Sequence, residues 1–350
     1  AHRIAAGLAQ VRTGGDEPSP VEIRRALRDV IRHCLYGVDI NPMAVELCKV
    51  NLWLESLEPG KPLSFLDAHI RCGNSLVGLG FGMKTEDLEI PDEAFTPVTG
   101  DHKATASLLK KRNKKERERQ ESLLINQANT TENQDRWLAK YNRTLEAMPE
   151  DDAEQVQAKQ EAFARLNQSA AYQRQKRIAD FWTAAFFWKI EEIESTEFET
   201  VAPTHIQLDR FRKGQPMQPG LQEKVNDLCR EESFFHWPLE FAEVAAQDGF
   251  DVVVGNPPWE RIKLQEKEFF TVHDSEIAVA SNKAAREKLI RKLRESDPAL
   301  AQKFEKAKHA AECNSKFMRA SGRFPLTSVG DLNTYALFSE HFRSLMNPRG

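Results

Sequence analysis

The sequence feature that most constrains the fold is residues 251–259, Asp-Val-Val-Val-Gly-Asn-Pro-Pro-Trp. The three consecutive valines predict a buried strand of a parallel sheet, because both faces of such a strand contact helices. Gly255 and the two prolines end the strand, since proline has no N–H to donate to a neighbouring strand. Asn256 and Trp259 then lie just past its carboxyl end, where open α/β sheets bind their ligands. The alternative interpretation is a strand followed by a rigid proline turn.

The segment Asn256-Pro257-Pro258-Trp259 resembles the Asn/Asp-Pro-Pro-aromatic motif of amino-methyltransferases that use S-adenosylmethionine. The resemblance implies that the Asn256 side-chain oxygen and the Pro257 backbone carbonyl accept the two hydrogens of an exocyclic amine. Catalysis would then consist mainly of positioning and charge placement. It also implies that Trp259 stacks on a base flipped out of a DNA duplex. These four residues are the predicted catalytic residues.

Residues 34–40, Cys-Leu-Tyr-Gly-Val-Asp-Ile, predict a second buried strand that ends on a carboxylate, and Asn41-Pro42 begins a helix. An aspartate at a strand end can bind ribose hydroxyls, but Asp39 or Asn41 can equally cap the helix, and geometry alone leaves both open. Residues 36–54 resemble the second motif of the amino-methyltransferases. The resemblance implies that Asp39 binds the cofactor ribose, that Ile40 packs on its adenine, and that Asn41 belongs to the same cofactor-binding group.

Residues 69–76, His-Ile-Arg-Cys-Gly-Asn-Ser-Leu, predict a short strand that leaves through a turn. In the resembled family a Gly-Asp/Asn-Ser/Ala element at this place lies beside the adenine of the cofactor. The resemblance therefore makes Asn74 and Ser75 predicted cofactor contacts. Asp67 and His69 lie close by, and we interpret them as either structural or substrate-side residues.

The composition changes at residues 81–234, which predict long polar helices with a charge run at 110–117 and an aromatic block at 181–188. We interpret this part as an antiparallel helical insertion whose aromatic end packs back on the sheet domain. The charge run is interpreted as a solvated surface, with contact to DNA phosphates as the less favoured alternative. The predicted organisation is a cofactor-binding half at 1–80, the insertion, and a catalytic half with a charged helical segment at 235–350.

These elements predict an α/β protein with a Rossmann-like S-adenosylmethionine-dependent methyltransferase fold and a large α-helical insertion. The family's Gly-rich loop for the methionine end of the cofactor has no counterpart, because Gly14-Gly15 follows a helix instead of a strand. We therefore expect an incomplete fold, an internal fragment of a larger protein, and weak or absent cofactor binding by the fragment alone. The motif order, the long insertion and the tryptophan resemble the large methylases of bacterial restriction–modification and anti-phage defence systems.

Charge and composition limit the remaining classes. The formal net charge of −4 gives no global nucleic-acid signature. No apolar run reaches the roughly 18 residues of a membrane-spanning helix, and the N-terminus has no signal-peptide pattern, so we expect a cytoplasmic protein without membrane association. The five cysteines include no Cys-x-x-Cys pair, which argues against a disulfide scaffold and a zinc ribbon. We expect no structural metal.

The leading hypothesis is N6-adenine methylation of double-stranded DNA, with restriction or defence-system subunits as further partners. The same motif acts on protein glutamine in release factors and on guanine in ribosomal RNA, but the long insertion disfavours those compact enzymes. A non-catalytic helical binding module on a methyltransferase fold is a third hypothesis, which the intact Asn-Pro-Pro-Trp segment disfavours. The sequence contains no convincing Asp…Glu-x-Lys cluster, so no nuclease site is assigned.

Overall fold

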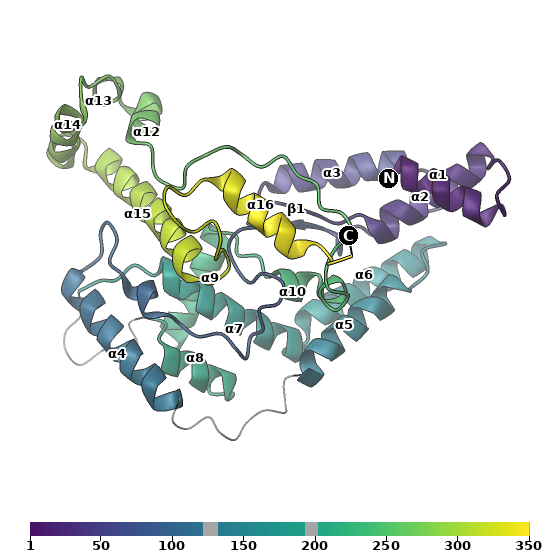
Figure 1. The fold of residues 1–350 in the computed structure, drawn as a ribbon, viewed down its shortest axis with the longest axis horizontal. Coiled ribbons are helices and arrows are strands. Elements are labelled where there is room, and N and C mark those ends of the chain that lie inside the picture. The colour runs from purple at the N-terminus through teal and green to yellow at the C-terminus, as the bar shows by residue number, and fades with distance from the viewer. Residues whose placement is uncertain (122–131, 193–201, 350) are drawn as a thin grey trace.

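The structure is a computed structural model that describes residues 1–121, 132–192 and 202–349. Helices make up most of these ranges, and a small parallel sheet lies near the centre of the molecule (Figure 1). Its two strands, β1 (Gly37–Asp39) and β2 (Ile70–Cys72), pair with Val38 opposite Arg71. The complete Rossmann-like arrangement stays a prediction.

The helices surround this sheet in three groups (Figure 1). One group, at the upper right, contains α1 (His2–Arg12), α2 (Pro20–Cys34) and α3 (Pro42–Glu55). The group below contains η1 (Asp92–Phe95), α4 (Lys103–Glu121), α5 (Glu132–Glu146), α6 (Ala153–Gln168), α7 (Ala170–Phe187), α8 (His205–Arg212), α9 (Pro219–Glu231), α10 (Trp237–Glu240) and α11 (Ala242–Ala245). The upper left group contains α12 (Glu266–His273), α13 (Ser275–Ala278), α14 (Lys283–Ser296) and α15 (Pro298–Ala320), and α16 (Thr334–Leu345) crosses the middle of the view.

Side chains at the helix starts explain where α2 and α3 begin. At α2, the Glu22 N–H donates to the Ser19 hydroxyl oxygen at 3.3 Å and the Ser19 N–H donates to Glu22 Oε2 at 2.6 Å, which is a capping box. At α3, Asn41 Oδ1 accepts from the Met43 N–H at 2.9 Å. Asn41 is therefore the residue that caps α3. The sequence left open whether Asp39 or Asn41 caps this helix, and the structure shows that Asn41 does.

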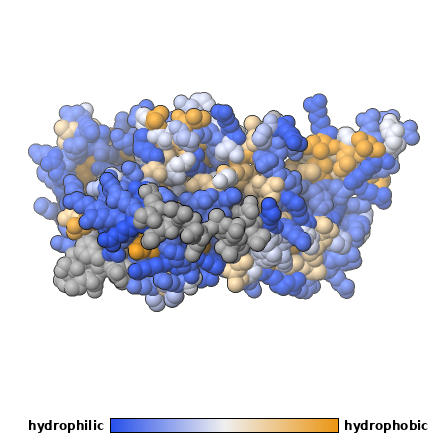
Figure 2. Space-filling view, turned by 60° about the horizontal axis from the view of Figure 1, so that its bottom comes forward, coloured by the Kyte–Doolittle hydropathy of each residue, from blue (hydrophilic) through white to orange (hydrophobic). Residues whose placement is uncertain are grey.

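The α1–α3 group exposes much of its apolar surface. Leu47 and Leu54 of α3 are more than half exposed, and Val45 is the apolar residue of α3 that is buried. Apolar side chains appear in orange at the right-hand end of Figure 2, the end that carries these helices in Figure 1. The described part of the chain therefore covers only one side of α3.

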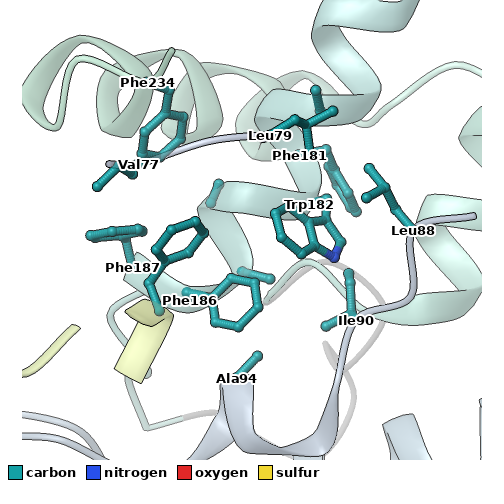
Figure 3. Packing of buried hydrophobic residues seen from close by; sticks show 14 of the residues in the cluster. Val77, Leu79, Leu88, Ile90, Ala94, Phe181, Trp182, Phe186, Phe187 and Phe234 are labelled. Carbon is teal, nitrogen blue, oxygen red and sulfur yellow. The ribbon is translucent and has the colours of Figure 1, made fainter. Parts of the chain in front are cut away.

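The main hydrophobic core is built around the aromatic end of α7 (Figure 3). Phe186 and Phe187 lie with their ring centroids 5.2 and 5.8 Å from the ring of Phe317 on α15, and Trp182 packs edge-on against Phe186 at 5.2 Å. Leu76, Val77 and Leu79, which follow β2, belong to the same cluster. The prediction that the aromatic block packs back toward the sheet is confirmed, because these contacts join the inserted helices to the turn after β2.

The predicted buried strand at residues 251–254 is wrong. The segment is not a strand, and the side chains of Val252 and Val254 are 73% and 88% exposed. A strand needs hydrogen bonds to a neighbour, and the pairing stops at Phe250, which forms a parallel bridge with Met346. Beyond that bridge the segment and β1 line the same cavity instead of pairing with each other.

Within the described ranges, no helix combines the length and the apolar composition needed to cross a membrane. The same ranges contain no group of three His, Cys, Asp or Glu side chains arranged to hold a metal ion. The free cysteines include Cys72, beside β1, and Cys313, in the core.

Two buried histidines make the fold sensitive to acid. Burial lowers the pKa of His236, and burial together with the nearby Arg323 guanidinium lowers the pKa of His341. A histidine that stays neutral when folded but protonates when unfolded stabilises the fold fully above a pH of about 6.5 and progressively less below it. We expect the melting temperature to fall between about pH 7.5 and pH 5.5, and to fall less in His341→Asn, as followed by circular dichroism. A rise on acidification would contradict this assignment.

Candidate active site

A cavity of about 2100 Å³ lies between β1, residues 249–264 and α16. Pockets for one small ligand usually measure about 300–1000 Å³, so this cavity has room for a nucleotide-sized cofactor and a second planar group. All of the predicted site residues except Asn41 line it: Asp39, Ile40, Asn74, Ser75, Asn256, Pro257, Pro258 and Trp259. Residues that are far apart in the sequence therefore meet in one place.

Asp39 and Ile40 form one wall of the cavity, where β1 ends. Asp39 Oδ1 accepts a hydrogen bond from the Asn41 N–H at 2.7 Å, and its other carboxylate oxygen bonds to none of the described residues. The Ile40 side chain is 57% exposed beside it. This wall therefore offers a carboxylate oxygen and an apolar surface, while the Asn41 side chain is used as the cap of α3.

The turn after β2 forms the neighbouring wall. The Asn74 N–H donates to the Ser233 carbonyl at 2.7 Å, and Asn74 Oδ1 accepts from the Leu76 N–H at 3.2 Å. The Ser75 carbonyl accepts from the indole N–H of Trp237 at 3.0 Å. These hydrogen bonds fix the turn. The Asn74 side-chain NH₂ keeps two donors without a partner among the described residues.

Buried Arg323 links this turn to α16. Its guanidinium donates to the carbonyls of Ser75 at 2.5 Å and Gly78 at 3.3 Å, and its Nη2 lies 3.2 Å from His341 Nδ1. Burial lowers the pKa of Arg323 to about 9. Burial and the Arg323 charge lower the pKa of His341 on α16, which favours the neutral imidazole, whose Nδ1 can accept from Arg323. One buried hydrogen-bond network thus joins the turn after β2 to α16, and both of these elements line the cavity.

Asn256 and Trp259 form the opposite wall. The Asn256 side chain is exposed and bonds to none of the described residues. Trp259 is 81% exposed, and its ring centroid lies 5.6 Å from that of Tyr335 on α16 with an interplanar angle of 39°. The Asn256 amide and the Trp259 ring therefore line the cavity together, and Tyr335 packs against Trp259.

Gly255 allows α16 to pack directly behind this segment. A Cβ atom at this position would lie 2.6 Å from Cζ of Phe342, a distance that real Cβ contacts do not reach. Phe342 and Phe338 of α16 also line the cavity. A glycine before Asn256 is needed for this close approach.

Thr334 holds residues 256–259, the proline segment, in place. The role of Thr334 was not apparent in the sequence. Its hydroxyl donates to the Pro258 carbonyl, and its hydroxyl oxygen accepts from the Glu260 N–H at 2.9 Å. The Thr334 N–H also donates to the Glu260 carbonyl at 2.9 Å, next to the antiparallel bridge between Arg261 and Asn333. The only signal in the sequence was the Asn-Thr pair before an apolar helix, which is typical of an N-terminal cap.

Asp67 and His69 do not line the cavity. The buried His69 ring stacks on Tyr36 with centroids 4.0 Å apart, and its Nε2 lies 2.9 Å from Glu146 Oε1. Asp67 pairs with Lys49 at 2.6 Å. Both residues therefore have structural partners, which favours the structural interpretation over the substrate-side one.

Comparison with known families identifies the chain. The Eco57I restriction-modification methylase family matches residues 33–288, which is most of the sequence. The chain belongs to this family. The matched range contains Asp39, Asn74 and the Asn-Pro-Pro-Trp segment, whereas α16, which also lines the cavity, lies beyond it.

A curated relative agrees with this membership. The chain is 26% identical over 270 residues to the "Putative type II restriction enzyme and methyltransferase RM.MjaORFECS2P" of Methanocaldococcus jannaschii. The alignment covers 73% of this chain but 20% of the relative, so the chain spans about a fifth of that protein's length. No solved structure matches the chain.

Proposed function

We propose that this chain is the methyltransferase part of a restriction–modification or anti-phage defence protein. In this proposal it methylates N6 of an adenine flipped out of double-stranded DNA, and restriction or defence subunits are its partners. The observation that carries the proposal is the Asn-Pro-Pro-Trp segment, which faces the same cavity as Asp39. Membership in a methylase family supports it.

The free oxygen atoms of this segment suit an exocyclic amine. The Asn256 side-chain oxygen and the Pro257 carbonyl have no hydrogen-bond partner among the described residues, so both are available as acceptors. Two acceptors fix the two N6 hydrogens and orient the nitrogen lone pair, which is catalysis by positioning and electrostatics. Trp259 supplies an exposed flat surface for stacking of the flipped base, with Tyr335 beside it.

The residues on the β1 side fit S-adenosylmethionine, the cofactor that methylases of this kind generally use. Bound S-adenosylmethionine supplies an electrophilic methyl group on a sulfonium. The unpaired Asp39 oxygen suits ribose hydroxyls, exposed Ile40 suits the adenine face, and the free Asn74 NH₂ suits a ring nitrogen. These groups line the cavity at the end of β1 and in the turn after β2, and the acceptors for the amine line it at Asn256 and Pro257.

The proposal is tested by supplying the full-length protein with labelled S-adenosylmethionine and three substrates in parallel. These substrates are unmethylated plasmid DNA, ribosomal RNA and a translation release factor. We expect label in the DNA alone. Label in the RNA or the release factor would overturn the DNA substrate while keeping an amine as the acceptor, and no label in any substrate would favour a binding module.

Thr334→Val is expected to lower methyl transfer because it removes both hydrogen bonds of the hydroxyl to the proline segment. Two such bonds are worth about 1–3 kcal/mol, so we expect a loss of roughly ten- to a hundredfold in kcat. Thr334→Ser keeps the hydroxyl and should retain most of the activity. Equal activities of the two variants in a single-turnover assay would show that Thr334 does not position the segment.

A further inference from the structure

Residues 262–332 form a projecting helical arm beside the candidate active site, visible at the upper left of Figure 1. The arm begins three residues after Trp259, and its two ends are joined by a hydrogen bond from the Ile262 N–H to the Leu332 carbonyl at 3.1 Å. It has a small core of its own, which includes Phe270 and Phe304. The arm is therefore a folded unit attached directly to the proline segment.

One continuous helix, α15, fixes the arm relative to the cavity. Ala301 and Phe304, in its first half, belong to the core of the arm, whereas Cys313 and Phe317, in its second half, belong to the main core. Its 23 residues span about 35 Å. Because both halves are packed, the arm has a defined position with respect to Asn314, which lines the cavity.

The surface of the arm is basic on α14. This helix carries six basic and two acidic side chains, although the whole chain has a net charge of −4. Lys288, Arg291 and Lys292 are exposed and form no ion pair within 4.0 Å with any described residue. The three other basic side chains of α14 are paired: Lys283 with Glu287, Arg286 with Glu266, and Arg294 with Glu305.

The spacing of the three unpaired cations places them together. Positions i, i+3 and i+4 lie on the same face of a helix, so Lys288, Arg291 and Lys292 are neighbours. Like charges at this spacing destabilise a helix by a few tenths of a kcal/mol per pair. Glu287 and Glu295 lie on the same helix, but neither pairs with these three cations within 4.0 Å, so the cluster is suited to bind an external polyanion.

We propose that this face of α14 binds the phosphates of duplex DNA on one side of the target base. The inference rests on the proposed function and adds a contact surface to it. From Pro298, where α15 starts, to Asn314 at the cavity the distance along the helix is roughly 25 Å. A length of that order corresponds to about seven base pairs at 3.4 Å each, so we expect the phosphate contact to lie several base pairs from the methylated base.

The test is a triple variant, K288A/R291A/K292A, of the full-length protein, compared with wild type for DNA affinity over a range of salt concentrations. Each phosphate contact contributes about 0.9 to the slope of log K against log salt, so three contacts should lower the slope by nearly three. We expect the Kd for duplex DNA to rise at least about tenfold at 0.1 M salt. The charge-preserving variant K288R/K292R should bind like wild type.

A matched control neutralises three cations elsewhere. Lys110, Lys111 and Lys115 of α4 are also exposed and unpaired among the described residues, but they do not line the cavity. K110A/K111A/K115A should change the DNA affinity less than about twofold, which also tests whether the charge run is a solvated surface. Melting is a further readout, because the α14 variant loses like-charge repulsion and should melt no lower than wild type.

An unchanged salt slope and affinity in K288A/R291A/K292A, with wild type binding DNA normally, would overturn the inference. An equal loss in the α4 variant would overturn it too, because the effect would then reflect only total charge. Failure of the proposed function looks different. Wild type would bind DNA with the arm-dependent slope but transfer no methyl group to it, and that result would still support the contact.

Discussion

Asn256→Ala is expected to reduce kcat for DNA methylation by about a hundred- to a thousandfold in the full-length protein. The variant removes one of two acceptors for the amine hydrogens, and nothing else in the described part of the chain supplies an oxygen with the same position on the proline segment. The side chain is exposed and has no partner, so the free energy of unfolding should change by less than about 0.5 kcal/mol. DNA affinity and cofactor affinity should stay close to those of wild type.

Two further variants make this result specific. Asn256→Asp keeps an acceptor oxygen, and the resembled motif allows Asp at this position, so it should retain a measurable part of the activity. Asn226→Ala removes an exposed asparagine from α9, away from the cavity, and should have no effect. Activity of Asn256→Ala close to that of wild type would remove this side chain from the mechanism.

Asp39→Asn is expected to weaken S-adenosylmethionine binding by about ten- to a hundredfold. An amide oxygen can still accept the Asn41 N–H, so the start of α3 should be preserved. What is lost is the charged acceptor for the ribose hydroxyls, and hydrogen bonds to charged groups contribute about 1.5–3 kcal/mol. Isothermal titration of the full-length protein with cofactor measures the change.

Asp16→Ala is the matched control for this variant, because Asp16 is an exposed acid in the loop between α1 and α2 and does not line the cavity. It should bind the cofactor like wild type. Asp39→Asn should also keep its affinity for DNA, since Asp39 lies on the cofactor side. A cofactor Kd equal to that of wild type would mean that the carboxylate does not contact the ribose.

The sequence predicted those features that depend on local chemistry. The helix start at Pro42 is set by the neighbouring Asn41 side chain, so a short pattern is enough to find it. The position of Asp39 at the end of a strand was also predictable, because a short apolar run followed by an acid and a proline defines both boundaries. The aromatic block was correctly expected to be buried, since five large aromatic side chains cannot be left in water.

Features that depend on distant partners were not predictable. The strand expected at residues 251–254 has the right composition, but its pairing depends on a neighbour at that edge, and composition carries no information about that neighbour. Thr334 contacts Pro258 across 76 positions, and Arg323 contacts Ser75 across 248. Such contacts follow from how α15 and α16 return to the cavity, and short sequence patterns do not determine this.

The sequence pattern alone also did not predict that residues 262–332 pack into an arm. Residues 281–320 were expected to be a charged helical segment, and a charged helix is usually only a solvated surface. What changes the interpretation of α14 is its place in the structure, on a unit joined to the proline segment and fixed by α15. The function that we propose for the α14 cations therefore follows from their location in the structure.

The measurement that tests the central claim most directly is the identity of the modified nucleoside. Duplex DNA is treated with the full-length protein and S-adenosylmethionine, digested to nucleosides and analysed by mass spectrometry against standards. We expect N6-methyldeoxyadenosine in DNA treated with the wild type, and none in DNA treated with Asn256→Ala. Methylated cytosine as the sole product, or N6-methyldeoxyadenosine formed equally by the variant, would contradict it.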